Sequence, residues 1–478
     1  MTGKPDPSAQ AVDLAQAFEA QRAAFARDRC PSLLVRQERL MRLREVVLDG
    51  QRELQDAICR DFGHRSLDES RVAEIAGTVA AIDYAIDHLR QWMRPRSHAT
   101  SIWFLPASNR VTAQPVGVVG IIAPWNYPVN LALVPLASAL AAGNRAMVKM
   151  SELSEATTQV LARLIRQRFS EDEVVLVGGD ARVAESFSAL PFAHLLFTGS
   201  GRVGRMVMGA AAKNLTPVTL ELGGKCPAIV GDDYAISEAA QRILWGKTFN
   251  AAQTCIAPDY VLVPRGEANA FVEAMMGHYA HRFPQGALDG SYTSIIDQRN
   301  FDRLTALVDE ARDAGARIFA AERPTQALAA ARKFPLTLVL NAPADARVMR
   351  EEIFGPVLPV LEYDTLDDAL RLINQGDHPL GLYYFGHSAA GQRQVVEGSL
   401  SGGVAVNDVM LQFLQVDLPF GGVGASGFGR YHGRAGFDTF SNLKSVFVQR
   451  GIGNFTGLKL LYPPYGKLGR MVIRLMGG

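Results

Sequence analysis

The chain is poor in cysteine, and its few cysteines follow no known spacing. Cys30, Cys59, Cys226 and Cys255 are the four cysteines among 478 residues, and they form no Cys-x-x-Cys pair and no metal-ligand pattern. This excludes a disulfide framework and a zinc site of the usual spacing. We therefore expect no bound metal and a reducing, cytoplasmic setting.

Long apolar runs and an excess of one charge are also lacking. No stretch reaches the roughly 18 apolar residues of a membrane span, and the N-terminus has no apolar segment of signal-peptide length. With 49 basic and 48 acidic residues, the formal net charge is +1, which gives no electrostatic reason to expect a nucleic-acid partner. The tail after residue 450 is mildly basic and apolar. We expect it to pack on its own chain or on a partner subunit rather than on a membrane.

What the sequence does contain is an alternation of strand and helix patterns. Residues 8–94 show apolar positions at helical spacing, and Pro95 closes that region. From Val111 onward, short apolar runs bounded by Gly and Pro alternate with helical segments, both before and after Cys226. This alternation implies right-handed crossovers and parallel sheets. Because 478 residues exceed one compact core, the sequence predicts an α/β protein of two or three domains.

A glycine pattern follows one predicted strand. Gly199, Gly201 and Gly204 match G-x-G-x-x-G at a strand-to-helix junction, where a dinucleotide pyrophosphate would bind the helix N-terminus. That motif also requires an acid about 20 residues further on, and Glu221 stands near that distance. The pattern alone would make Glu221 a ribose ligand, although a lone match of this kind is a weak signal.

Cys255 differs from the other cysteines in its surroundings. It lies among small and polar residues in NAAQTCIAP, whereas Cys30, Cys59 and Cys226 fit the commoner role of a buried, unreactive thiol. Glu221 and Cys255 are separated by 34 residues, so only the fold could bring them together.

Seven segments resemble, in order, the signature blocks of the aldehyde dehydrogenase superfamily. They are APWNYP at 123–128, VKMSELS at 148–154, FTGS at 197–200, LELGGK at 220–225, QTCIAPDY at 253–260, EEIFGP at 351–356 and LPFGG at 418–422. The resemblance spans roughly residues 10–450. QTCIAPDYVL, GGVAVNDV, FGGVGASGFGRYHG and YPPYG resemble most closely the class-three-type branch, which includes fatty and aromatic aldehyde enzymes and bacterial coniferyl aldehyde dehydrogenases.

The resemblance implies catalytic roles for three residues. The Cys255 thiolate would attack the aldehyde carbonyl and pass through a thiohemiacetal to a thioester. Asn126 would donate its side-chain amide to the oxyanion, with the Cys255 N–H as the second donor. Glu221 would activate the water that hydrolyses the thioester. This role conflicts with the ribose role drawn from the glycine pattern. We follow the resemblance, because it also accounts for Glu152 and Lys149.

The resemblance also implies a cofactor site. Glu152 would bind the adenosine ribose, and its carboxylate suits a 2′-hydroxyl better than a 2′-phosphate, so we expect NAD, with NADP possible. Glu352 would bind the nicotinamide ribose and Phe354 would pack on the ring. Gly201 falls where the family has a larger residue, so only two of the three glycines are included. The implied cofactor residues are Pro124, Trp125, Lys149, Glu152, Phe197, Gly199, Ser200, Gly204, Leu222, Glu352 and Phe354.

Some positions depart from the family pattern or keep two interpretations. Met150 and Ala252 replace a usual Pro and Gly, and Ala252 is expected to reshape the loop that carries Cys255. We expect His432 to bind backbone or line the substrate mouth rather than act as an acid or base. Substrate entry and core packing are equally open for four aromatic residues, Tyr383, Tyr384, Phe413 and Phe420.

The resemblance implies a Rossmann-type cofactor domain at 1–96 and 115–226, and an α/β catalytic domain at 227–424. Segments 97–114 and 425–450 would form a protruding β-hairpin arm, followed by a tail at 451–478. Family members bury this arm against a second subunit, so we expect a homodimer.

The expected reaction is NAD(P)-dependent oxidation of an aromatic or medium-to-long aldehyde to its acid, with coniferaldehyde as the first substrate to test. Three alternatives stay open. They are a thiol hydrolase or acyltransferase without redox chemistry, a non-catalytic dinucleotide-binding protein, and an acylating dehydrogenase that uses coenzyme A. Glu221 argues against the last one, because a water-activating base is wasted when a thiol is the acceptor.

Overall fold

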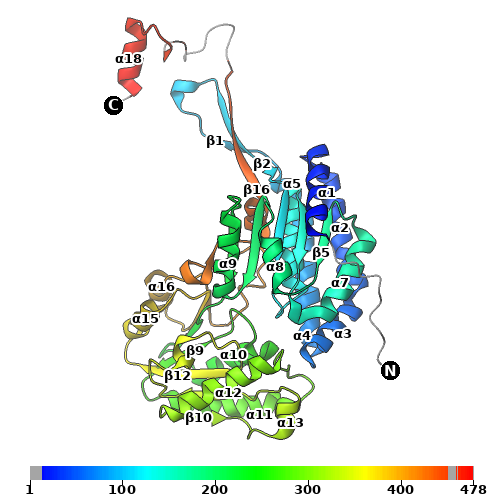
Figure 1. Cartoon of the computed structure of the whole chain (residues 1–478). Coiled ribbons are helices and arrows are strands. Elements are labelled where there is room, and N and C mark those ends of the chain that lie inside the picture. The colour runs from blue at the N-terminus through cyan, green and yellow to red at the C-terminus, as the bar shows by residue number, and fades with distance from the viewer. Residues whose placement is uncertain (1–12, 451–458, 460, 477–478) are drawn as a thin grey trace.

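The computed structural model describes residues 13–450, 459 and 461–476. Its strands form three sheets of six, seven and three strands, and the smallest sheet projects from the body (Figure 1). Among the described helices, none is long and apolar enough to cross a membrane.

The N-terminal region is helical, as predicted, over the part that the structure describes. Its helices pack around the edge of the six-stranded sheet (Figure 1). A π-helix, η1 (Arg71–Ala76), joins the fourth helix to the fifth. The helices are α1 (Leu14–Arg27), α2 (Leu33–Asp49), α3 (Gln51–Phe62), α4 (Leu67–Ser70) and α5 (Gly77–Trp92).

The six-stranded sheet has the order β15-β7-β6-β3-β4-β5. All its neighbours are parallel except β15, which pairs antiparallel with β7. The chain order reverses between β3 and β6, and ligands of open parallel sheets bind at such a reversal, beyond the carboxyl ends of the strands. The strands are β3 (Val118–Ile122), β4 (Arg145–Lys149), β5 (Val174–Val177), β6 (His194–Gly199), β7 (Val218–Leu222) and β15 (Gly427–Phe428).

Four helices connect these strands. They are α6 (Asn130–Ala142), α7 (Glu155–Arg168), α8 (Ala181–Ser188) and α9 (Gly201–Ala212). Every residue of α6 is buried, and the helix ends before Gly143. Gly143 has a φ of 92°, a left-handed conformation that favours glycine, so a glycine suits this helix end.

The seven-stranded sheet has the order β10-β11-β12-β9-β8-β13-β14. Its neighbours are parallel except for the antiparallel pair β10 and β11. The alternation predicted after Cys226 is thus present as strands separated in several places by helices. The strands are β8 (Pro227–Val230), β9 (Tyr260–Pro264), β10 (Arg317–Ala320), β11 (Thr337–Leu340), β12 (Val357–Tyr363), β13 (Gly381–Phe385) and β14 (Gly403–Val406).

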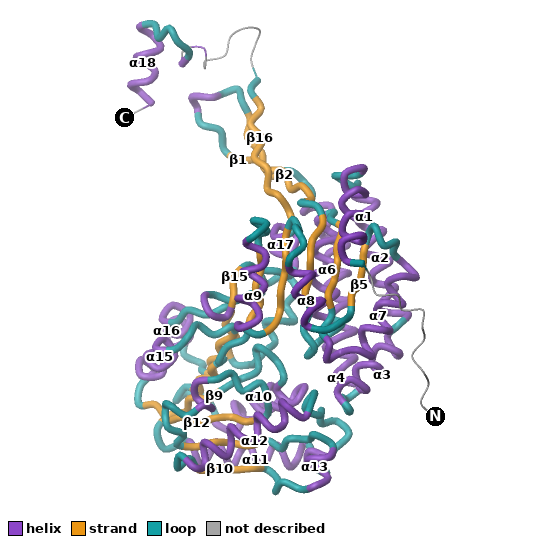
Figure 2. The backbone as a smooth tube through the Cα atoms, viewed as in Figure 1, coloured by secondary structure: helices purple, strands orange, loops and turns teal. Residues whose placement is uncertain are grey.

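Helices cover this second sheet (Figure 2), and one of them leads into the loop with Cys255. That helix, α10, is followed by the 3-10 turn η4 (Phe249–Ala252). The helices are α10 (Ile236–Thr248), α11 (Ala268–Arg282), α12 (Gln298–Asp313), α13 (Gln326–Ala330), α14 (Arg347–Arg350), α15 (Leu366–Gln375) and α16 (Ala389–Gly398).

The projecting arm is an antiparallel sheet of β1 (Arg96–His98), β2 (Ser108–Pro115) and β16 (Ser441–Val448). The segment 425–450, which we assigned to the arm, divides between two places. β15 belongs to the six-stranded sheet and α17 (Gly433–Thr439) packs against α6, while β16 lies in the arm. A last helix, α18 (Lys467–Met476), lies beyond the tip of the arm (Figure 1).

Candidate active site

The carboxyl ends of parallel strands bring most of the predicted site residues to one edge of the six-stranded sheet. Ile122, the last residue of β3, pairs with Lys149 of β4 and Phe197 of β6. The segments 123–126, 149–152 and 197–200 therefore leave the sheet side by side. Glu221 stands at the corresponding end of β7, opposite Thr198. The sheet register thus explains why residues far apart in sequence share one site.

The loop that carries Cys255 begins in an unusual backbone conformation. Asn250, Ala251 and Ala252 have φ values of 51°, 48° and 56°, which lie in the left-handed region. Such a conformation costs free energy for residues other than glycine, so the replacement of a usual Gly by Ala252 places strain next to the nucleophile.

Gln253 fixes this loop through its side chain. Its amide nitrogen donates to the carbonyls of Asn250 and Ser294, each at 3.0 Å, and its amide oxygen accepts from the Ile296 N–H at 2.9 Å. All three polar contacts of a buried amide are therefore made within the protein, which stabilises the strained turn.

Asn126 contacts the same loop from the β3 side. Its side-chain nitrogen donates to the Gln253 carbonyl at 3.1 Å, and the residue is buried. An amide nitrogen carries two N–H groups, so one remains to meet an oxyanion next to Cys255. Asn126 is thus hydrogen-bonded to the residue that lies two positions before the nucleophile in the sequence.

A buried ion pair behind Asn126 is not evident from the sequence. Arg65 donates to Glu74 at 3.0 Å and to the Asn126 carbonyl at 2.9 Å, and both charged side chains are fully buried. Glu74 also accepts from the backbone N–H groups of Val129 and Asn130 at the start of α6. These contacts link the loop between α3 and α4 to η1, α6 and the Asn126 turn, and no local sequence pattern indicates them.

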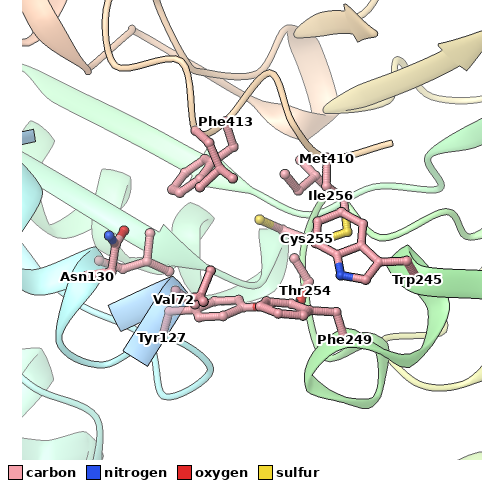
Figure 3. A pocket seen from close by; sticks show the side chains of 13 residues that line it. Val72, Tyr127, Asn130, Trp245, Phe249, Thr254, Cys255, Ile256, Met410 and Phe413 are labelled. Atoms are coloured by element: carbon pink, nitrogen blue, oxygen red, sulfur yellow. The ribbon is translucent and has the colours of Figure 1, made fainter. Parts of the chain in front are cut away.

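Cys255 lies on the wall of an apolar pocket. Tyr127 and Phe249 lie on one side of the thiol and Phe413 on the other (Figure 3). The Tyr127 hydroxyl bonds to the Thr254 hydroxyl at 2.6 Å, so this wall is joined to the Cys255 loop. The lining residues are Val72, Ala73, Tyr127, Asn130, Leu131, Trp245, Phe249, Thr254, Cys255, Ile256, Met410, Phe413 and Leu414.

The electrostatics of this pocket oppose a resting thiolate. Burial, together with the charges of Glu352 and Glu221, raises the pKa of the Cys255 thiol to about 12. The N–H groups of Cys255 and Ile256 act in the opposite direction. The two carboxyl groups are therefore close enough to Cys255 to repel its thiolate, and the thiol must lose its proton to a base before it attacks.

Glu221 is fully buried at the end of β7. Neither carboxyl oxygen has a hydrogen-bond partner among the described residues. Burial raises the pKa of Glu221 well above its usual value, and the charge of Arg430 lowers it only in part. Its Oε1 lies 2.8 Å from the position that a Cβ on Gly421 would occupy, so only glycine at 421 leaves the carboxyl group in place.

Tyr431 is a neighbour of this carboxyl group that the sequence did not single out. Its backbone exchanges two hydrogen bonds of 2.8 Å with Phe420, directly before Gly421. Its hydroxyl is buried with no hydrogen-bond partner within the described ranges, and the charges of Glu221 and Cys255 help to raise its pKa.

Two of the three glycines at the predicted pyrophosphate end of α9 have no space for a side chain. A Cβ at Gly199 would lie 2.6 Å from the Phe197 ring, and one at Gly204 would lie 2.8 Å from Leu222. A Cβ at Gly201 would meet only the flexible end of Arg205, at 3.6 Å. This agrees with leaving Gly201 out of the cofactor residues. Ser200 caps α9 by accepting from the Val203 N–H, which leaves the helix N-terminus facing the strand ends.

The predicted ribose residues adopt two different arrangements. Lys149 is buried and donates to the carbonyls of Met150 and Gly179, at 2.6 and 2.7 Å, so two of its three N–H groups are used on backbone. Burial lowers the pKa of Lys149, and the charges of Glu152 and Asp180 act against this. Glu152 is exposed at the start of η3 (Glu152–Ser154), where its carboxylate is accessible to a ligand.

The predicted nicotinamide residues lie next to the nucleophile. The Glu352 carboxyl group accepts from the Gly224 N–H at 3.3 Å and presses against Gly223, and burial raises its pKa to about 8. Phe354 packs edge-on against Trp125, with ring centroids 5.4 Å apart. The turns after β3 and β7 and the segment 351–356 thus meet beside Cys255, and this cradle fits a dinucleotide whose reactive ring must reach the thiol.

His432 is a packing residue. It is buried against the rings of Phe413, Phe420 and Tyr431, and burial lowers its pKa to about 3. It is therefore neutral near pH 7 and a poor acid or base.

The four aromatic residues left open in the sequence divide between pocket and core. Phe413 lines the pocket, and Phe420 stacks on His432. Tyr383 donates to the Ile256 carbonyl from behind the Cys255 loop. Tyr384 belongs to a separate buried cluster, so only Phe413 faces the pocket.

One expectation about the cysteines is wrong. Cys30 is exposed, in the turn between α1 and α2, rather than buried in an amphipathic helix. Cys226 is buried, as expected, and its thiol donates to the Cys255 carbonyl at 3.4 Å. All four cysteines are free.

Comparison with known protein families identifies the family of this chain. The model of the aldehyde dehydrogenase family matches residues 6–446. The chain belongs to the aldehyde dehydrogenase family. Its activity is therefore the NAD(P)-dependent oxidation of an aldehyde, and solved structures of this family bind NAD⁺ or NADP.

Relatives place the chain within the family. It is 48% identical to the "Probable coniferyl aldehyde dehydrogenase" of Pseudomonas aeruginosa, over 94% of this chain and 93% of that protein. It is 38% identical to rat aldehyde dehydrogenase family 3 member B1, over 93% of each. The structure of substrate-bound AldH from Staphylococcus aureus matches with a TM-score of 0.91 and 34% identity, over 98% of this chain and all of that one. The predicted class-three-type branch is thus confirmed.

Proposed function

We propose that this aldehyde dehydrogenase oxidises a hydroxylated aromatic aldehyde of the coniferaldehyde type to its carboxylic acid. The observation that carries this proposal is the apolar pocket beside Cys255, whose lining includes the aromatic rings of Tyr127, Trp245, Phe249 and Phe413. Aromatic walls favour a flat, conjugated substrate. The resemblance to a coniferyl aldehyde dehydrogenase over almost the whole chain supports the same substrate class.

Asn130, a residue that lines this pocket, supports a substrate that carries a hydroxyl group. The side-chain oxygen of Asn130 is buried without a partner in the described part of the chain. Its amide orientation is set by Thr78, whose hydroxyl donates to the Glu74 carbonyl and must therefore accept from the Asn130 nitrogen. An unpaired buried acceptor costs free energy, and a phenolic hydroxyl of the substrate would offset that cost.

We assign Cys255 as the nucleophile of the first chemical step. Its thiol gives a proton to a base, and the sulfur forms a bond to the aldehyde carbon. The free N–H of the Asn126 amide and the Cys255 backbone N–H stabilise the oxyanion of the thiohemiacetal. Bound NAD⁺ supplies the hydride acceptor that turns this intermediate into a thioester.

We assign Glu221 as the base of the second step, the hydrolysis of the thioester. Its carboxylate takes a proton from water, the hydroxide adds to the thioester carbon, and the C–S bond breaks to release the acid and the thiolate. Both oxygens of Glu221 lack a partner among the described residues and can accept from that water. Only the ionised carboxyl group can act, and burial raises its pKa. The hydrolysis rate should therefore rise with pH.

We further propose NAD⁺ as the preferred cofactor, a homodimer, and the cytoplasm as the site of action. The exposed carboxylate of Glu152 would repel a 2′-phosphate and accept from a 2′-hydroxyl. The arm exposes several large apolar side chains, and a nucleophilic free thiol suits a reducing compartment. The exposed arm residues are Ile102, Trp103, Leu105, Leu443 and Phe447.

A kinetic panel tests the substrate and the cofactor together. Aliphatic, benzylic and cinnamyl aldehydes are compared by kcat/KM with NAD⁺ and NADP⁺, followed by the absorbance of reduced nicotinamide. We expect the highest value for coniferaldehyde with NAD⁺. A higher kcat/KM for long aliphatic aldehydes would reject the substrate proposal without affecting the assignment of Cys255.

Two variants test the assigned residues against the alternatives. Cys255→Ser should abolish oxidation while cofactor binding persists, and a non-catalytic dinucleotide-binding protein would not show this loss. Glu221→Gln should give a burst of reduced cofactor followed by a stall in turnover. Unimpaired steady-state turnover by Glu221→Gln would reject its role as base. Release of acid from an ester without reduced cofactor would favour the thiol hydrolase instead.

A further inference from the structure

The C-terminal helix α18 separates its charged and apolar side chains onto opposite faces. Lys467, Arg470 and Arg474 stand at i, i+3 and i+7, so they share one face of the helix. The apolar side chains occupy more than half of the remaining circumference, since successive residues are about 100° apart. They are Leu468, Met471, Val472, Ile473, Leu475 and Met476.

The charge of the C-terminal region differs from that of the rest of the chain. The last 40 residues hold six of the 49 basic residues and none of the 48 acidic ones, so they carry +6 while residues 1–438 carry −5. The overall net charge of +1 conceals this separation. A basic helix with a wide apolar face and no acid is the composition that binds anionic lipid surfaces.

α18 does not pack on the catalytic body of its own chain, which is one of the two places where we expected the tail to pack. Gly469 is its one buried residue among those described, and Leu468, Met471 and Leu475 are 53%, 51% and 62% exposed. The hydrogen bonds shown for Arg470 end on the carbonyls of Tyr465 and Gly466, within the tail itself. The helix also lies outside residues 6–446, which match the family model.

Two exposed tyrosines precede the helix. Tyr462 and Tyr465 are 60% and 47% exposed, and tyrosine is enriched where a membrane meets water, because its ring is apolar and its hydroxyl is polar. The two tyrosines, the basic face and the apolar face of α18 are together the kinds of side chain found in helices that lie at a membrane surface.

We propose that α18 binds in the plane of an anionic lipid bilayer and holds this enzyme at the membrane surface. The apolar face sinks below the headgroups, and Lys467, Arg470 and Arg474 contact the lipid phosphates. A groove on a second copy of the chain would cover one stripe of the helix and leave the rest of its wide apolar face in water. A bilayer covers that face completely and also pairs the unopposed positive charge of the tail.

Vesicle flotation with the full-length enzyme tests this proposal. Vesicles of phosphatidylcholine mixed with phosphatidylglycerol are compared with vesicles of phosphatidylcholine alone, at low and high salt. We expect the enzyme to float with the anionic vesicles only, and less at high salt. Because each basic side chain near an anionic surface contributes about tenfold or somewhat less to binding, the double variant Arg470→Gln/Arg474→Gln should bind about 30-fold more weakly.

A matched pair of variants tests the apolar face. Leu468→Asp should abolish flotation, whereas Leu400→Asp, which changes an equally exposed leucine after α16, should float like the original chain. Aldehyde oxidation without vesicles reports folding, and we expect both variants to keep it. Absence of flotation by the original chain, or flotation of Leu468→Asp equal to it, would overturn the proposal. A smaller sedimentation coefficient of Leu468→Asp, without vesicle binding by the original chain, would instead show that α18 binds a second copy.

Discussion

Glu352 and Cys255 form the most informative pair at the residue scale. The thiol has a pKa raised to about 12, first by burial and then by the charge of Glu352, and burial raises the pKa of Glu352 itself to about 8. As pH rises through 8, Glu352 ionises and its negative charge opposes formation of the thiolate. This carboxyl group therefore restrains the nucleophile most strongly in alkaline solution.

We predict that Glu352→Gln speeds alkylation of Cys255 by iodoacetamide several-fold at pH 9, because a neutral amide no longer raises the thiol pKa. The rate is measured by mass spectrometry of the peptide that contains Cys255, which separates it from the exposed Cys30. Glu351→Gln is the control, since Glu351 is exposed and bonds to Arg347 at the surface. Equal alkylation rates in Glu352→Gln and the original chain would contradict the electrostatic coupling.

A second prediction at this scale concerns Asn130. Asn130→Leu keeps the size of the side chain and removes its buried acceptor, so it should lower kcat/KM for coniferaldehyde by about tenfold. For the analogue with a methylated phenol, kcat/KM should change little. Val72→Ala is the control, because it changes an apolar part of the same pocket and should affect both substrates alike. Equal losses for both substrates with Asn130→Leu would reject a hydrogen bond to the phenol.

At the scale of elements, the buried pair of Arg65 and Glu74 connects the N-terminal helices to the active site. Glu74 caps the first backbone N–H groups of α6, and Arg65 bonds to the carbonyl of Asn126. Part of the free energy of folding is thus used to hold the oxyanion donor. The strained residues Asn250–Ala252 are held by the same region, since the Asn250 side chain also donates to the Asn126 carbonyl.

We predict that Glu74→Gln lowers the free energy of unfolding by about 3 kcal/mol, because it leaves the Arg65 charge buried without its partner. Its urea midpoint should fall, and kcat should fall with it as the Asn126 turn loosens. Glu53→Gln, which breaks the exposed pair with Arg163, is the control and should leave the midpoint unchanged. If Glu74→Gln has the same urea midpoint as the original chain, the pair contributes no stability.

At the scale of the whole molecule, the helices and strands could be predicted from the sequence, whereas the contacts between residues far apart in the chain could not. The strands follow from local apolar runs, whereas Phe197 and Lys149 were named only through the resemblance to the family. The sheet register explains why these two residues lie at one edge. Arg65 bonds to a carbonyl 61 positions away, and no local pattern indicates such a contact. The same holds for Tyr431, whose position beside Glu221 depends on β15 and Phe420.

The arm carries the last prediction, because its role depends on the assembly of whole chains. It projects from the body with Trp103 and Phe447 exposed by 40% and 51%. Exposed apolar side chains on a projecting sheet favour burial against a second chain. We therefore predict that Phe447→Asp converts a dimer into a monomer at micromolar concentration, as measured by sedimentation velocity. Leu400→Asp, with equal exposure on the body, should remain dimeric. If the original chain sediments as a monomer, the dimer proposal is rejected. Membrane binding through α18 would then be a property of the monomer.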